Sequence, residues 1–223
     1  MIEHNGKFLP FSINDQHLWL SADKTIFWEE QKTLIVADIH FSKVGTFRKA
    51  GIGITQKLTV SDLMTLMNMV YYFKTERLVV VGDFFHSKAN KELPLFEKWR
   101  KDFPSLKIDL VKGNHDILDN GWYKKNHIEI HQPQLIIGPF GFVHDIYDVQ
   151  HPLTRYYFCG HEHPGIRLRS IRAKDSAILP CFHFTGGYCV LPAFSAFCGT
   201  STVKAAANEN IFAIAEGKVL QVS

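Results

Sequence analysis

The chain has 223 residues, of which 46% are hydrophobic and 21% charged, and its formal net charge is +3. This composition supports a folded core and excludes an intrinsically disordered chain. The net charge is too small to indicate nucleic-acid binding by itself.

Predicted strands and helices alternate in the first half of the chain. Three short apolar runs, at residues 32–38, 77–82 and 106–111, are typical of strands buried on both faces. Between them, residues 59–72 and 91–102 carry apolar side chains at helical spacing. Because parallel strands need crossover connections of this length, the pattern predicts a βαβαβ unit.

The second half contains mainly strand candidates, and helical signals end after about Ile128. The candidates are residues 134–137, 141–144, 156–159, 166–171, 178–184, 188–191, 211–215 and 219–222. Glu216-Gly217 predicts a hairpin turn between the last two. A βα-rich half followed by a strand-rich half predicts an α/β (α+β) fold, with two β-sheets packed face to face and helices outside the first sheet. We expect one domain over residues 1–223.

No feature of the sequence indicates a membrane anchor or a disulfide framework. The four cysteines form no C-x-x-C pair, and the N-terminal residues lack a basic segment followed by an apolar run. Residues 176–203 are uncharged, but Pro180 and Pro192 interrupt them, so they predict buried strands rather than a membrane helix. We expect a cytoplasmic protein without membrane association, with its cysteines buried as small hydrophobic side chains.

Five short polar segments follow predicted strands in a chain that contains twelve histidines. They read Asp38-Ile-His40, Gly82-Asp-Phe-Phe-His86, Gly113-Asn-His-Asp116, Val143-His-Asp145 and Gly160-His-Glu-His163. Ligands in α/β folds gather at the carboxyl ends of parallel strands. In an extended segment residues i and i+2 point to the same side, so Asp38 is expected to converge with His40, and His161 with His163.

The segments offer seven candidate metal ligands, namely Asp38, His40, Asp83, Asn114, His144, His161 and His163. A set without a thiolate favours an open catalytic site over a closed structural zinc site, with Mn²⁺ as the expected ion and Fe, Ni or Zn as alternatives. Seven ligands exceed the need of one open ion, so we expect two divalent ions that share Asp83. Their residual charge of about +2 favours hydrolysis of a phosphate ester.

In this order, the five segments resemble those of the calcineurin-like metallophosphoesterases, and the match spans Asp38 to His163. The resemblance implies a four-layer αββα sandwich. It also implies that one ion takes Asp38, His40, Asp83 and His163, and that the other takes Asp83, Asn114, His144 and His161. It further implies that His115 faces the scissile phosphate, as proton donor or transition-state stabiliser, and that Asp116 orients its ring. We expect His86 beside the Asp83 loop, without direct ligation.

Within that family, the chain is similar to the bacterial ligase-associated DNA damage response endonucleases or phosphoesterases. Residues 40–43, 47–52, 82–87, 161–164 and 191–194 carry this similarity. Ser42 and Thr55 stand where that branch is expected to have Gly and Pro. The similarity implies a phosphodiester substrate, such as DNA or RNA, and a DNA ligase or helicase as a repair partner. It leaves the oligomeric state open.

Basic side chains follow the first and last ligand pairs. Lys43 and Arg48 come after the first pair, and Arg167 and Arg169 after the last, with no acidic residue between 41 and 61 or between 164 and 174. These four residues are candidates to bind a nucleic-acid backbone. The alternative is that they form ordinary solvated surface.

Three functions remain open at this point. The first is hydrolysis of phosphodiesters, with a nuclease acting in DNA repair as its sharpest form. The second is a phosphomonoesterase or small-nucleotide hydrolase. The third, from a different class, is a nucleic-acid-binding adaptor with a structural metal site.

Overall fold

The apolar runs of the first half lie side by side in a seven-stranded sheet of the computed structural model, which describes residues 6–41, 57–85, 92–149, 155–169, 176–196, 198–204 and 206–223. In spatial order its strands are β1 (Phe8–Ile13), β2 (Gln16–Ser21), β3 (Ile26–Trp28), β4 (Thr33–Ala37), β5 (Arg77–Val81), β6 (Lys107–Val111) and β7 (Ile128–His131). Strands β4 to β7 are parallel, and α2 (Lys57–Tyr72) and α3 (Leu93–Asp102) lie between β4, β5 and β6 in the chain. The predicted βαβαβ unit is therefore confirmed.

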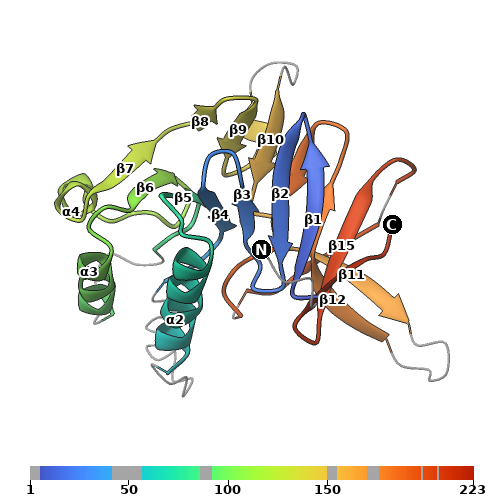
Figure 1. Ribbon diagram of the computed structural model, residues 1–223, viewed down its shortest axis with the longest axis horizontal. Coiled ribbons are helices and arrows are strands. Elements are labelled where there is room, and N and C mark those ends of the chain that lie inside the picture. The colour runs from blue at the N-terminus through green and yellow to red at the C-terminus, as the bar shows by residue number, and fades with distance from the viewer. Residues whose placement is uncertain are drawn as a thin grey trace.

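The second half forms a nine-stranded mixed sheet. Its strands are β8 (Gln134–Ile137), β9 (Phe140–Val143), β10 (Tyr156–Cys159), β11 (Pro164–Arg169), β12 (Ser176–Phe184), β13 (Tyr188–Val190), β14 (Ser201–Val203), β15 (Asn210–Ala215) and β16 (Lys218–Gln221). The order is β14-β11-β12-β13-β10-β9-β8, and β15 and β16 attach through β12. β15 and β16 pair as the predicted hairpin, with positive φ at Glu216 and Gly217. Figure 1 shows β11 and β12 extending away from the rest of this sheet.

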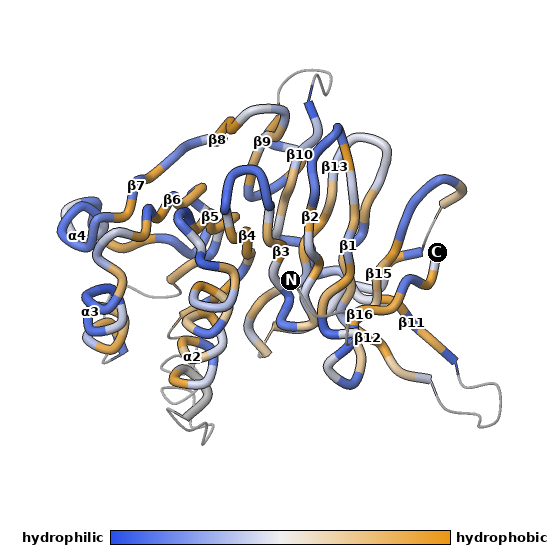
Figure 2. Tube along the Cα trace, viewed as in Figure 1, coloured by the Kyte–Doolittle hydropathy of each residue, from blue (hydrophilic) through white to orange (hydrophobic). Residues whose placement is uncertain are grey.

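Aromatic side chains fill the space between the two sheets. The rings of Trp28 and Phe140 lie 4.7 Å apart, and Phe11 lies 4.4 Å from Phe184. Alternate residues of β4 face this core, as Ile35 does, while the others face the helices. Burial on both faces explains why the run is continuously apolar, and Figure 2 shows β4 and β5 as mainly hydrophobic, in contrast to the largely hydrophilic α4 (Asn120–Lys125).

Helices α2 and α3 pack on the outer face of the first sheet (Figure 1). Over the outer face of the second sheet, Ile146 and Val149, in and next to the 3₁₀ helix η1 (Ile146–Asp148), pack against the cluster formed by Val143 and Tyr157. Within the described ranges, this 3₁₀ turn is the helical structure found on the outer face of the second sheet, where the resemblance implies a layer of helices. No helix of the described residues is long and apolar enough to cross a membrane.

A crossing segment joins the two sheets at the end of β4. β3 pairs antiparallel with β4, and its first residue, Ile26, lies opposite Ile35. Ala37, two residues farther along β4, therefore has no partner in β3. Residues 193–195, which follow β13 of the second sheet, occupy this edge through a parallel bridge between Ala37 and Ala193. The N–H of Phe194 donates to the carbonyl of Ala37 at 2.9 Å. The polar segments after β4, β5 and β10 therefore meet where the sheets are tied together.

Candidate metal centre

Five of the seven candidate ligands have left-handed backbone conformations. Their φ values are 52° at Asp38, 46° at His40, 50° at Asp83, 69° at His161 and 48° at His163. The expectation that each pair forms an extended segment is therefore wrong, because the two pairs lie in the turns that follow β4 and β10. Such strained backbone is concentrated at functional sites, where surrounding structure holds it in place.

The first group of ligands surrounds a buried carboxylate oxygen of Asp38. Ligand atoms of Asp38, His40 and Asp83 lie within 4.8 Å of one another. His163 Nε2 lies 3.6 Å from Asp38 Oδ1. Asp38 is fully buried, and its Oδ1 has no hydrogen-bond partner among the described residues. Because an unsatisfied buried carboxylate is costly, this atom fits a cation ligand.

The second group is centred on His144, which follows β9. Its Nε2 lies 3.2 Å from His161 Nδ1. Asp145 Oδ2 lies 3.9 Å from the other ring nitrogen of His161. His161 therefore lies with His144, whereas His163 lies with Asp38.

Asp83 lies between the two groups. Its Oδ2 is 3.8 Å from His40 Nε2 and 3.7 Å from His144 Nε2. Its Oδ1 accepts a hydrogen bond from the N–H of His115 at 2.8 Å. A single carboxylate thus faces one histidine of each group, which is the arrangement that a shared ligand requires.

The spacing of these side chains fits bound cations better than direct hydrogen bonds. Contacts of 3.6–3.8 Å between ring nitrogens and carboxylate oxygens are too long for hydrogen bonds. Two ligands that each lie about 2.1 Å from one ion can be up to about 4.2 Å apart, depending on the angle at the ion, and this range includes the observed contacts. The donor set of carboxylates and imidazoles therefore fits one divalent cation in each group.

The G-N-H-D segment lies against Asp83. The hydrogen bond from His115 to Asp83 fixes its backbone, and both Asn114 and His115 are exposed. Asp116 is buried, and its carboxylate accepts hydrogen bonds from the N–H groups of Phe85 (2.9 Å) and Gly113 (3.0 Å). Burial raises the pKa of Asp116 to about 7, while these hydrogen bonds lower it. Asp116 thus joins two ligand-bearing loops, and its effect on the His115 ring stays a prediction.

Two glycines of the motifs allow the ligands to approach the backbone. A Cβ at Gly82, whose φ is +77°, would lie 1.8 Å from His144 Nδ1. A Cβ at Gly160 would lie 2.6 Å from Asp38 Oδ2. A side chain at either position would therefore displace a candidate ligand.

The predicted substrate-binding residues divide into two sets. Arg167 and Arg169 are exposed on β11, and Arg167 Nη1 donates to Ser176 Oγ at 3.2 Å. They lie four and six residues beyond His163, or about 13 and 20 Å along an extended strand. Lys43, Arg48 and His86 lie outside the described residues.

A cavity of about 540 Å³ adjoins the second ligand group. Its lining includes Asn114, His144 and Lys112, so it connects the candidate ligands with a cationic side chain. Lys112 was not among the predicted site residues, although its place directly before the G-N-H-D segment is a usable signal.

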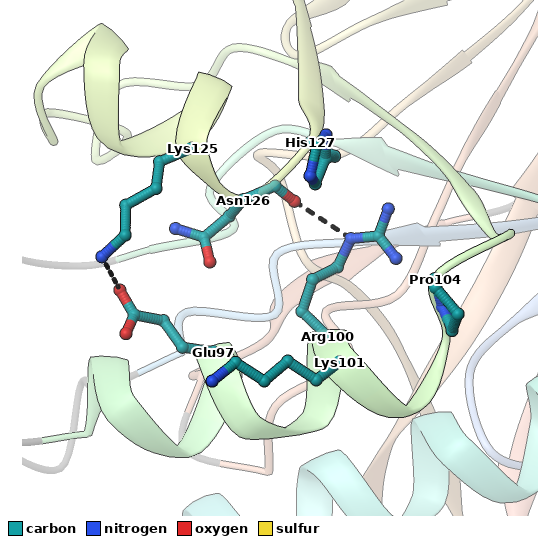
Figure 3. A pocket seen from close by; sticks show the side chains of 7 residues that line it. All are labelled: Glu97, Arg100, Lys101, Pro104, Lys125, Asn126 and His127. Carbon is teal, nitrogen blue, oxygen red and sulfur yellow. Dashed lines mark hydrogen bonds and ion pairs between the residues drawn. The ribbon is translucent and has the colours of Figure 1, made fainter.

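A cavity of about 490 Å³ between α3 and α4 lies away from these ligands (Figure 3). Arg100 is buried there and donates to the carbonyls of Phe103, Leu106 (3.1 Å) and Asn126 (3.0 Å). Leu106 precedes β6, whereas Asn114 follows it, so this cavity is at the opposite end of the strand. Its arginine holds helix ends rather than a ligand.

One of the four cysteines departs from the expectation that all are buried. Cys159, Cys181 and Cys189 are buried, as predicted, and burial raises the pKa of each thiol. Cys198 is only half-buried and lies close to His40 and His163. This neighbour could not be predicted from local motifs, because Cys198 is far from both histidines along the chain.

Comparison with known proteins agrees with this geometry. A family model described as calcineurin-like phosphoesterase matches residues 31–180, and no curated protein matches the chain. Among solved structures, the chain is similar to the Pseudomonas putida nuclease MPE, with 29% sequence identity and a TM-score of 0.81, over 96% of this chain and 100% of that chain.

Two further solved structures match the chain with lower TM-scores. The protein of unknown function AQ665 from Aquifex aeolicus has 19% identity and a TM-score of 0.40, over 59% of this chain and 77% of that chain. The E. coli phosphoesterase Yfce has 14% identity and a TM-score of 0.43, over 85% of this chain and 97% of that chain. Since the family model covers more than half of the residues, the chain belongs to the calcineurin-like phosphoesterases, a family of metal-dependent hydrolases.

Proposed function

We propose that the protein hydrolyses phosphodiester bonds of nucleic acid at a centre of two divalent cations. One cation would be held by Asp38, His40, Asp83 and His163, and the other by Asp83, Asn114, His144 and His161. The observation that carries the proposal is the position of Asp83 Oδ2, 3.8 Å from His40 Nε2 and 3.7 Å from His144 Nε2.

The protein's own groups divide the chemical work. Divalent cations bound here would polarise the phosphoryl oxygens and lower the pKa of a water molecule. His115 is exposed, and its backbone is fixed on Asp83, so its ring can donate a proton to the leaving oxygen. Asp116 keeps the loop of His115 attached to the loop of Asp83.

Three observations support a polymeric substrate. The Pseudomonas putida relative at 29% identity is a nuclease. Lys112 lines the cavity beside Asn114 and His144, where it can contact a second phosphate. Arg167 and Arg169 are exposed along β11, which begins next to His163. They can therefore contact phosphates farther along a bound nucleic-acid strand.

Substrate profiling tests the proposal. The full chain is assayed with Mn²⁺ on single- and double-stranded DNA, on RNA, and on a chromogenic diester and monoester. We expect diesters to be cleaved faster than the monoester, and all activity to stop after chelation. Faster turnover of the monoester, with no cleavage of nucleic acid, would instead favour a phosphomonoesterase.

Asp83→Asn separates an enzyme from a binding adaptor. The variant should lose roughly a thousandfold in kcat/KM, because about 4 kcal/mol of transition-state stabilisation depends on the shared carboxylate. Glu162→Gln is the matched control, since Glu162 is exposed between His161 and His163 and should retain activity. An adaptor would bind nucleic acid equally well in both variants and show no turnover in the wild type.

The resemblance to ligase-associated relatives supports two narrower proposals. We propose that the protein acts in the cytoplasm and that a DNA ligase or helicase is its repair partner. Co-purification of such an enzyme with the full chain from its own cells tests the second, and its absence at physiological salt would reject it.

A further inference from the structure

Cys198 lies beside the first ligand group, although the sequence predicts a centre without a thiolate. Its Sγ and one ring nitrogen each of His40 and His163 lie within 4.8 Å of one another. Cys198 is half-buried, whereas the other three cysteines are fully buried. Its sulfur is thus the thiol that the described structure brings to the candidate ligands.

The chain around Cys198 is fixed against His163. The Gly199 carbonyl accepts a hydrogen bond from His163 Nδ1 at 3.2 Å, and the N–H of Ser201 donates to the His163 carbonyl at 2.9 Å. From Ser201, β14 pairs in parallel with β11. Both the ring and the main chain of His163 therefore hold this segment in place.

These contacts also orient the His163 ring. Because a carbonyl oxygen can only accept, Nδ1 carries the proton and Nε2 keeps its lone pair. Nε2 lies 3.6 Å from Asp38 Oδ1, the buried oxygen without a hydrogen-bond partner among the described residues. The sulfur thus adjoins a group with an unsatisfied carboxylate oxygen and an oriented imidazole.

We propose that Cys198 supplies a thiolate ligand to the cation held by Asp38, His40, Asp83 and His163, and that this position prefers thiophilic ions over Mn²⁺. This inference rests on the proposed two-cation centre. Sulfur is a soft donor that favours Zn²⁺, Co²⁺ or Cd²⁺, whereas carboxylate and amide oxygens suit Mn²⁺. When the bond forms, the thiol loses its proton to water and a sulfur electron pair is donated to the ion.

A thiolate from Cys198 would make the two cation positions chemically different. No cysteine is grouped with His144 or His161 among the described residues. That position therefore keeps the oxygen and nitrogen donors expected for Mn²⁺. A mixed centre, with a thiophilic ion next to Asp38 and a harder ion next to Asn114, is the expected resting composition.

Cobalt spectroscopy tests the ligand directly, without an activity assay. The full chain is freed of metal and titrated with Co²⁺ in the absence of oxygen. We expect a thiolate-to-cobalt charge-transfer band in the near ultraviolet for the wild type, and its loss in Cys198→Ser. Cys181→Ala, which removes a buried cysteine, is the matched control and should keep the band.

Thiol protection gives a second measurement on the wild type, independent of whether the variant folds. Alkylation of Cys198 by iodoacetamide is followed by mass spectrometry with and without Cd²⁺. Coordination should slow this reaction at least tenfold. An unchanged rate in protein shown to contain bound Cd²⁺ would overturn the proposal.

Two cobalt results would also overturn it and can be told apart. Visible d–d bands without the charge-transfer band would mean that the metal centre exists but Cys198 is not a ligand. Absence of any cobalt binding would reject both the thiolate ligand and the metal centre on which the proposed function rests.

Discussion

Gly82 is the residue on which the geometry of the second ligand group depends. It follows β5, has a φ of +77°, and lies so close to the His144 ring that a Cβ would be 1.8 Å from Nδ1. Two independent demands, left-handed backbone and lack of a side chain, therefore meet at one position. The requirement comes from a ligand that is 62 residues away in sequence (144 − 82).

Gly82→Ala should lower metal affinity and stability together. The left-handed conformation costs about 1 kcal/mol for alanine, and displacement of His144 removes a ligand from the second cation. We expect calorimetric titration to show at least tenfold weaker binding of the second cation. Gly186→Ala is the matched control, because no atom lies within 4 Å of a Cβ there. Equal affinity in both variants would contradict the proposed role of His144.

The types of candidate ligand could be predicted at the residue scale, but their conformations could not. The order of carboxylates, imidazoles and amide predicted the residues that now lie in two adjoining groups around Asp83. Positive φ at Asp38 and His40 could not be predicted, since it arises from hydrogen bonds of this loop to the loop after β5. Cys198 reaches the centre only through the pairing of β14 with β11.

At the scale of the elements, Arg100 joins the ends of two helices. Its guanidinium donates to carbonyls that follow α3 and α4 (Phe103, Leu106 and Asn126), as Figure 3 shows for Asn126. Carbonyl groups at helix ends lack partners within the helix. One buried side chain therefore satisfies polar groups from both connections that precede β6 and β7.

Arg100→Met should lower the free energy of unfolding by about 2 kcal/mol or more, because buried carbonyls lose their donors. Lys101→Met is the matched control, since Lys101 is exposed on the same helix. Urea denaturation measures both. Similar stability of the two variants would show that water replaces the guanidinium without cost.

Asp62 makes the anchoring of α2 depend on pH. Burial raises the pKa of Asp62 to about 6, and the charge of Lys24 opposes this only partly. The pKa is higher in the folded than in the unfolded state, so ionisation of this carboxyl group destabilises the folded protein. The free energy of unfolding should therefore fall as the pH rises from about 4 through 6.

Asp62→Asn should stabilise the protein above pH 6 and have little effect near pH 4. The gain should be about 1–2 kcal/mol, less than the pKa shift alone gives, because Asp62 is partly exposed to solvent. Thermal unfolding of wild type and variant across this pH range measures the difference. Asp102→Asn, at an exposed position on α3, should show no such trend.

Element prediction succeeded for the continuously apolar strands of the first sheet and for most strands of the second sheet, and it missed β1, β2, β3, β7 and β14. Strands β4, β5 and β6 are buried on both faces, so their sequences are continuously apolar and were recognised. β1 and β2 mix half-buried residues with buried and exposed ones, and β3, β7 and β14 are only three or four residues long. Such strands, and the six-residue helix α4, are defined by their neighbours rather than by their own sequence.

At the scale of the whole molecule, the aromatic core joins the two sheets. Phe11 of the first sheet contacts Phe184 at 4.4 Å and Phe212 at 5.3 Å, both in the second sheet. Trp28 contacts Phe140 in the same way. From this shared core we propose that residues 1–223 form one domain.

One domain should unfold in a single cooperative transition. Tryptophan fluorescence and far-ultraviolet circular dichroism should give the same midpoint in urea. Phe11→Ala should lower the free energy of unfolding by about 2 kcal/mol by both probes, because it removes a ring from between the sheets. Tyr147→Ala, at an aromatic residue that is 85% exposed, should leave it unchanged. Two separate transitions would contradict a single domain.

The candidate ligands come from both sheets, since Asp38 and Asp83 follow strands of the first, and His144 and His161 follow strands of the second. Cations bound between them would act as a clamp, so that binding and sheet docking are thermodynamically linked. A substitution such as Phe11→Ala, which touches no ligand, would then also weaken cation binding. The measured affinity for these cations would therefore report on the stability of the contact between the two sheets.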